Sequence, residues 1–163
     1  MFHAAYFTCY ENMEELRKEF LDFAYEFYSQ YVESYSSTEH INPCLVLPLS
    51  YIEFAREETN LFRLLFINHM DLSMAEQRIL YGGRQRERER VFSDTIGIEP
   101  ERAKAIFIDL FLYSHGIAVL AAAQKITLDR SHIEKMAANM LTALIRQEKP
   151  DWTLSVSGIT ESI

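Results

Sequence analysis

The sequence predicts an all-α protein, and three observations support this fold class. Apolar residues recur at three- and four-residue spacing over several long stretches, short clusters of proline, glycine and polar residues separate them, and no stretch alternates as a half-buried strand does. The chain has 163 residues and 48% apolar content, enough for one well-buried core and too few to argue for two domains. We therefore expect one multi-helix domain.

The first long helix is predicted from apolar residues that recur from Leu16 to Tyr35 at the spacing of one helix face. Asn12, with Glu15 three positions later, forms a capping pair before this stretch. The turn-forming sequence SSTEHINP at residues 36–43 ends it.

A second helix is predicted to begin near residues 42–43 or 47–48, because each pair ends in a proline and the first turn of a helix tolerates proline. We expect this helix to end around residues 59–60. An amphipathic piece follows at residues 61–66, and Ser73 with Glu76 then caps a further helix that runs toward Tyr81.

The sequence GGRQRERER at residues 82–90 interrupts this pattern. We interpret it as a solvated helical stretch rather than a site for an acidic partner, because runs of mixed charge are commonly surface. Each glycine weakens a helix by about 1 kcal/mol relative to alanine, so we expect a kink or a break there.

The last two helices are predicted most clearly. Gly97 and Pro100 mark the start of a helix that runs to about Lys125. The final helix is expected from Asp129 or Ser131 to about residue 149, and Pro150 closes it. Residues 150–163 are expected to form a flexible tail.

The charge of the chain argues against a nucleic-acid module. The formal net charge is -8 at pH 7, and acidic residues crowd the first forty positions, where Arg17 and Lys18 are the basic residues. Nucleic-acid modules usually present a basic face. A phosphate backbone would be repelled by this end of the chain.

Other classes are disfavoured by what the sequence lacks. Cys9 and Cys44 form no CxxC pair or zinc set and no secretory leader precedes them, so we expect a reduced cytoplasmic protein. The longest apolar run, residues 117–123, is too short for a bilayer span, so no membrane role is expected. There is no glycine-rich phosphate loop, HExxH, GxSxG or pair of Glu-x-x-His elements. We expect no enzyme, cofactor or metal.

The beginning of the chain resembles part of a known family. In bacterial repressors of the TetR family, a recognition helix of the pattern S-K-[GA]-T-hydrophobic-Y-x-Y-F is followed by a short polar turn and by K-E-E-L, which opens a long linking helix. Residues 4–16, AAYFTCYENMEEL, resemble this junction in order and without a gap. The resemblance implies that residues 1–11 are a remnant of the DNA-recognition helix and turn.

The differences from this pattern concern DNA binding. The family's lysine corresponds to His3, its threonine to Ala5, its first tyrosine to Phe7, and the lysine of K-E-E-L to Met13. Each change removes a donor that the family aims at phosphate or at a base edge. No residues remain for the first helix of a helix-turn-helix, which orients the second. We expect DNA binding to be absent or impaired, with DNA a partner only if the native protein has a complete helix-turn-helix.

Two further segments resemble the effector half of the same family. Residues 51–66, YIEFAREETNLFRLLF, resemble Y-x-x-F-A-x-x-x-P-x-L-F-x-L-M-F, with Asn60 offset from the usual proline. Residues 112–120, LYSHGIAVL, resemble W-x-x-x-H-G-L-A-x-L, with Leu112 or a neighbour in place of the tryptophan. Three segments in the same order and spacing are more specific than each one alone.

The resemblance implies that residues 12–149 form a ligand-sensing and dimerisation domain. In such regulators the last two helices of each subunit form a four-helix interface. Small residues that let helices approach closely, and methionines that adapt to irregular surfaces, are compatible with this task. The candidate interface residues are Ser114, Ala118, Ala121, Ala122, Ile133, Met136, Ala137, Met140, Leu141 and Leu144.

The central helices of such regulators enclose an apolar pocket with a few polar tips, which is the usual form of a small-molecule site. For any single aromatic residue a place in the core is the commoner alternative, and a lone histidine in an apolar helix is more often a core group than a catalytic base. The candidate ligand contacts are Tyr51, Phe54, Phe62, Phe66, Tyr81, Phe107, Phe111, Tyr113 and His115.

The function predicted from this resemblance is that of the sensing and dimerisation domain of a TetR-like transcriptional repressor. Its expected partners are a second copy of the chain, as a homodimer, and a small apolar or aromatic effector. The alternative is an interaction protein without a DNA-binding head, which forms heterodimers with an intact repressor.

Overall fold

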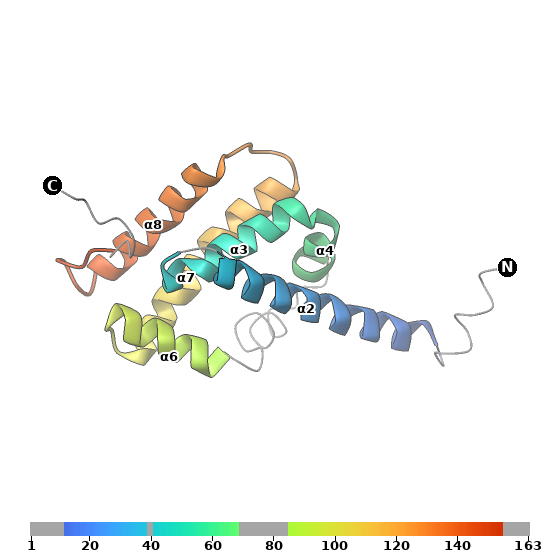
Figure 1. Ribbon diagram of the computed structural model, residues 1–163, viewed down its shortest axis with the longest axis horizontal. Coiled ribbons are helices and arrows are strands. Elements are labelled where there is room, and N and C mark those ends of the chain that lie inside the picture. Colours follow the sequence, from blue (N-terminus) through green and yellow to red (C-terminus); the bar gives the residue numbers. More distant parts are fainter. Residues whose placement is uncertain (1–11, 39–40, 69–84, 155–163) are drawn as a thin grey trace.

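The computed structural model describes residues 12–38, 41–68 and 85–154, and all regular secondary structure in these ranges is helical (Figure 1). The prediction of an all-α fold is therefore confirmed. In chain order the elements are α2 (Met13–Thr38), α3 (Pro43–Glu57), α4 (Thr59–Arg63), the π-helical η1 (Leu64–Asn68), α6 (Gln85–Ile96), α7 (Pro100–Ala122) and α8 (Arg130–Arg146).

Side-chain caps fix where three of the helices begin. The Asn12 side-chain oxygen accepts hydrogen bonds from the backbone N–H groups of Glu14 (3.0 Å) and Glu15 (2.9 Å) at the start of α2. Asn42 accepts from the backbone N–H of Cys44 at 2.9 Å, so α3 starts at the first of the two predicted positions. Asp129 caps α8 in the same way. Such caps satisfy N–H groups that have no partner within the helix.

The helix ends differ from the prediction by a few residues. Helix α2 continues to Thr38 through the predicted turn formers, because serine and threonine are only mildly unfavourable within a helix. Helix α3 continues through Pro48 without a break. Helices α7 and α8 end at Ala122 and Arg146, a few residues before their expected ends.

Helix α3 lies at the centre of the arrangement and packs against α2, α6, α7 and α8. Helix α7 also contacts α4, α6 and α8. The C-terminal half of α2 lies across the other helices, whereas its N-terminal half extends away from them (Figure 1). The core gathers on α3 and α7, and α2 contributes the buried residues Ala24, Tyr28 and Val32.

Two of the expected segments lie partly or wholly outside the described residues. The helix predicted from Ser73 toward Tyr81 and the glycine pair at residues 82–83 lie outside them, and α6 begins at Gln85. Of the expected tail, Trp152 and Leu154 lie half-buried against the core. The Arg146 side chain donates a hydrogen bond of 3.0 Å to the Trp152 carbonyl, which holds this segment beside α8.

Candidate functional site

Most of the aromatic residues predicted to contact a ligand lie together around Tyr51. The Tyr51 ring on α3 lies 5.1 Å from the ring of Phe66, 5.3 Å from Phe62 and 5.4 Å from Phe111, measured between centroids. The side chains of Tyr51, Phe54, Phe62 and Phe66 are fully buried. The sequence segment 51–66 and helix α7 therefore meet in one aromatic cluster.

A hydrogen bond of 2.8 Å joins the Tyr51 hydroxyl to Nδ1 of His115 within this cluster. Burial raises the pKa of Tyr51 well above its usual value and lowers the pKa of His115, because both charged forms would lose hydration. At neutral pH the bond therefore joins a neutral hydroxyl to a neutral imidazole. The geometry describes a hydrogen bond between the buried Tyr51 and the half-buried His115 that joins α3 to α7.

Little space remains beside the cluster. A void of about 10 Å³ lies where α3 meets α7, lined by Tyr51, Phe107, Phe111 and four neighbours. This volume is at most that of one water molecule. The ring of Phe66 packs edge-on or tilted against Tyr51, Phe54 and Phe62, and the rings of Phe62 and Tyr51 also pack against each other. These predicted ligand contacts form packed core in this structure.

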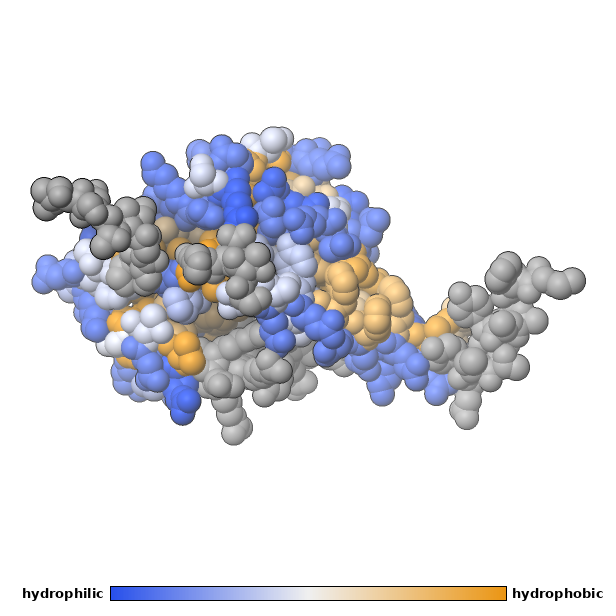
Figure 2. Space-filling view, viewed as in Figure 1, coloured by the Kyte–Doolittle hydropathy of each residue, from blue (hydrophilic) through white to orange (hydrophobic). Residues whose placement is uncertain are grey.

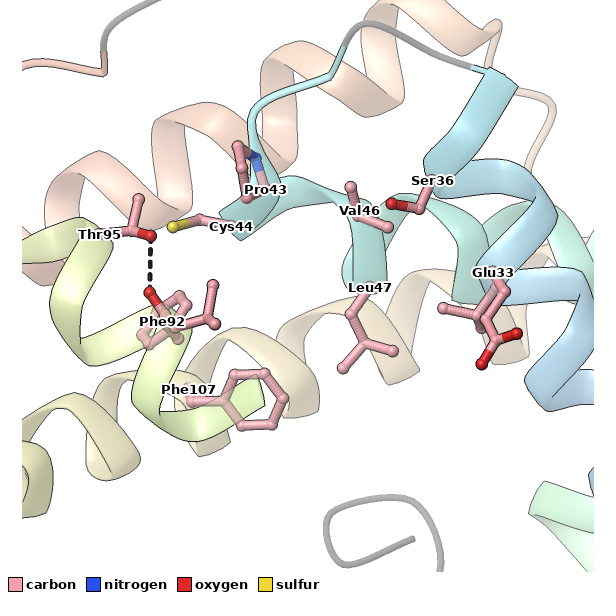
Figure 3. A pocket seen from close by; sticks show the side chains of 11 residues that line it. Glu33, Ser36, Pro43, Cys44, Val46, Leu47, Phe92, Thr95 and Phe107 are labelled. Carbon is pink, nitrogen blue, oxygen red and sulfur yellow. Dashed lines mark hydrogen bonds between the residues drawn. The ribbon is translucent and has the colours of Figure 1, made fainter. Parts of the chain in front are cut away.

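A larger cavity of about 510 Å³ lies between α2, α3, α6 and the start of α7 (Figure 3). Its size is within the range of small-molecule sites. The residues that line it come from four helices: Val32, Glu33, Ser36, Pro43, Cys44, Val46, Leu47, Val91, Phe92, Thr95 and Phe107.

The chemistry of this cavity is that of apolar walls with a few polar groups. Glu33 and Ser36 lie on the α2 side, and Thr95 lies on the α6 side (Figure 3). The Thr95 hydroxyl donates to the Val91 carbonyl at 2.6 Å, which leaves its oxygen able to accept. Burial raises the pKa of the Cys44 thiol to about 11, so the thiol is protonated at neutral pH.

Of the predicted ligand contacts, Phe107 is the one that the structure places in the wall of the larger cavity. Tyr113 lies half-buried on α7, and Tyr81 lies outside the described residues. The sequence reasoning did not identify the lining residues on α6. A signal was available, since Val91 and Phe92 form an apolar pair directly after the charged run, and Phe92 is buried.

Most of the residues predicted for the dimer interface are buried within a single chain. They are Ser114, Ala118, Ala122, Ile133, Ala137, Leu141 and Leu144, whereas Ala121, Met136 and Met140 are half-buried. The apolar stripe of each of the last two helices faces the core of its own chain, because α7 also packs on α3 and α8 packs on both. On the outer side of α7, Leu112 and Leu120 are exposed at 57% and 45%.

Comparison of the chain with family models, with curated proteins and with solved structures gave no match. The likeness to TetR regulators therefore rests on the sequence segments alone. Among the described residues, no group of three His, Cys, Asp or Glu side chains could hold a metal ion.

Helix α7 is long and apolar enough to cross a bilayer by length and composition. It is the one such helix in the described ranges, and a third of its most apolar window is buried. A single helix of this kind is weak evidence for a membrane, because core helices of globular proteins meet the same criteria.

Proposed function

We propose that this chain is the ligand-sensing and dimerisation domain of a TetR-like transcriptional regulator. The proposal is supported by the three sequence segments in the order of that family, by the all-α fold, and by a cavity of small-molecule size. It is carried mainly by one observation, namely that the long helix α2 forms part of the cavity wall.

The position of the cavity couples a ligand to α2. Val32, Glu33 and Ser36 lie on the C-terminal half of α2, and they face Cys44, Val46 and the other lining residues of α3. An occupant of the cavity would therefore contact the helix whose other half extends away from the body. A ligand shifts a conformational equilibrium only by its difference in affinity between two states. The mechanism therefore requires that α2 can take two positions, and that the cavity has a different shape in each.

Dimerisation in this proposal uses the outer face of α7 and α8. Leu112, Gly116 and Leu120 recur at four-residue spacing on α7, and all three are exposed. A Cβ atom added at Gly116 would meet nothing within 4 Å, so a second helix could approach closely there. The half-buried Met136 and Met140 lie on α8, which packs beside α7.

DNA binding by this chain is absent or impaired in the proposal. Helix α2 carries acidic residues in its first turn, and the net charge of the chain is -8, which opposes approach to a phosphate backbone. A DNA titration at low salt tests this point. Tight and sequence-selective binding by the chain alone would contradict it.

A dye-binding experiment tests the proposed site. N-phenyl-1-naphthylamine, an uncharged aromatic dye, is expected to bind with increased fluorescence, and Thr95→Trp is expected to reduce that binding by placing an indole in the cavity. Asp94→Trp on the same helix is the matched control, because Asp94 is exposed and does not line the cavity. Native mass spectrometry of the purified chain then reports the subunit number and any small molecule that copurifies. Equal dye binding by both variants would argue against this cavity as the site.

A second candidate function is an interaction protein that forms heterodimers with an intact repressor. The exposed apolar residues of α7 favour this candidate as much as they favour a homodimer, because either partner would cover them. Mixing the chain with an intact paralogue and following subunit exchange by native mass spectrometry separates the two. A pure sensor is expected to remain a homodimer.

A further inference from the structure

The first 15 residues of the 26-residue helix α2 carry a row of exposed phenylalanines. Phe20, Phe23 and Phe27 are exposed at 47%, 68% and 37%, and Met13 at 68%. Figure 2 shows an apolar patch over this part of α2, where the helix leaves the body of the protein. A contiguous exposed apolar patch commonly marks an interaction site.

These side chains form one stripe because of their spacing. Residues three, four and seven positions apart lie on the same side of an α-helix, so Phe20, Phe23 and Phe27 follow one another, with Met13 one heptad before Phe20. The Phe27 ring lies 6.3 Å from the buried ring of Phe54, measured between centroids. The stripe therefore runs outward from the edge of the core. We call Met13, Phe20, Phe23 and Phe27 the α2 stripe.

Carboxylates flank the α2 stripe. Glu19 lies four residues before Phe23 and Glu26 lies three residues after it, so both lie beside this ring on the helix surface, and both are exposed. Along the whole of α2 the acidic residues are Glu14, Glu15, Glu19, Asp22, Glu26 and Glu33, whereas the basic ones are Arg17 and Lys18. Although Arg17 lies three residues before Phe20, the helix as a whole carries a net negative charge.

This charge pattern disfavours a second copy of α2 as the partner. In an antiparallel pair of α2 helices that cross at Phe23, Glu19 of one copy would approach the Glu26 region of the other. In a parallel pair two helices that each carry six acidic and two basic residues would lie side by side. Like charges in these positions oppose association.

We propose that the α2 stripe binds an amphipathic helix of another polypeptide, whose apolar side chains are flanked by lysine or arginine. The apolar stripe supplies the contact area, and Glu19 and Glu26 select the basic flanks. This inference goes beyond the proposed function, since it needs neither an occupied cavity nor a dimer through α7.

Two designed peptides serve as probes. Each is a helix with leucines at the spacing of the stripe, and its flanking positions are all lysine in one peptide and all glutamate in the other. Fluorescence anisotropy is expected to show that the full chain binds the lysine peptide more tightly, and that added salt weakens this binding. Phe23→Ser, at an exposed position, is expected to weaken binding of the lysine peptide about tenfold or more. Without the Phe23 ring the complex buries less apolar surface.

Two variants distinguish this proposal from nonspecific hydrophobic binding of the peptides. Ile67→Ser removes an exposed apolar side chain from η1, outside the stripe, and is expected to leave peptide binding unchanged. The double variant Glu19→Lys/Glu26→Lys is expected to reverse the preference, so that the glutamate peptide binds more tightly. Equal binding of both peptides by the unmodified chain would overturn the proposal. A lower subunit number in Phe23→Ser than in the unmodified chain would also overturn it, because the stripe would then be an interface between copies.

Discussion

A hydrogen bond of 2.8 Å joins the Tyr51 hydroxyl on α3 to Nδ1 of His115 on α7, at the centre of the aromatic cluster. The bond links the two segments, 51–66 and 112–120, that resemble the effector half of TetR regulators. It also makes the stability of the core depend on the protonation state of one imidazole.

The free energy of unfolding is expected to fall as the pH is lowered from 7 to 5. Burial holds the pKa of His115 below its usual value of about 6.5, so below that pH the unfolded chain binds a proton that the folded chain resists. This contribution to stability is complete above about pH 6.5 and is lost as the pH falls toward the folded pKa. Urea unfolding at a series of pH values measures it.

The control for this pH dependence is a pair of histidine variants. His115→Gln removes the half-buried imidazole and is expected to flatten the profile between pH 7 and pH 5. His132→Gln, at an exposed position near the start of α8, is expected to leave the profile unchanged. The same slope in all three proteins would show that His115 does not cause it.

Tyr51→Phe is expected to lower the free energy of unfolding by about 1 to 3 kcal/mol, because it removes the buried hydroxyl and leaves Nδ1 of His115 without its hydrogen-bond partner. Thermal and urea unfolding at pH 7.5 measure the change. Tyr113→Phe, at a half-buried tyrosine of α7, is the comparison and is expected to cost less. An unchanged free energy of unfolding in Tyr51→Phe would mean that the hydrogen bond contributes little to stability.

Gly97→Ala is expected to destabilise the fold by about 1 kcal/mol or more, because Gly97 ends α6 with a φ of +63°, which side chains disfavour. A Cβ atom there would also lie 2.7 Å from Nζ of Lys149, which donates to the Ile96 carbonyl. Gly97→Asn is expected to cost less, since asparagine tolerates this backbone conformation better than alanine. Urea unfolding of the two variants compares them, and an equal loss would shift the cause from backbone conformation to the contact with Lys149.

Cys44 is expected to react slowly with a thiol reagent. In a Cys9→Ser background, its rate at pH 8 is expected to lie about a hundredfold below that of a free thiol, because the pKa is raised from 9.0 to about 11. The rate should rise with pH up to that value. Reaction in a denaturing concentration of urea restores the rate of an unprotected thiol and is the control. A fast reaction in the folded protein would contradict the buried, protonated state.

The helix starts could be predicted from the sequence because they depend on local chemistry. Asn12, Asn42 and Asp129 each cap a helix through a hydrogen bond to a residue two or three positions away, and such spacing is visible in the chain. The buried faces followed from periodicity in part, since Ala24 and Tyr28 of the predicted α2 face are buried whereas Phe20, Phe23 and Phe27 of the same helix are exposed. Neither signal requires knowledge of how the helices pack.

The cavity could not be predicted in the same way. Periodicity indicates that Tyr51, Phe54 and Phe66 are buried, but it does not indicate whether their rings fill the space between the helices or leave a hollow. The rings fill it. The larger cavity depends on residues far apart in sequence, such as Val32, Val46 and Val91, and on the position of α6 against α3. These are tertiary relationships.

The proposed homodimer makes a prediction at Leu112. The unmodified chain is expected to have about twice its chain mass of 19.1 kDa in solution, and Leu112→Glu is expected to have the mass of a single chain. Leu112 is 57% exposed on the outer side of α7, so a glutamate is harmless in a lone chain but becomes a buried, unpaired carboxylate when two copies meet there. Light scattering at several concentrations measures the mass. Phe23→Ser, which changes the α2 stripe instead, should remain dimeric. A single-chain mass for the unmodified protein, or a dimeric Leu112→Glu, would exclude this face as the interface.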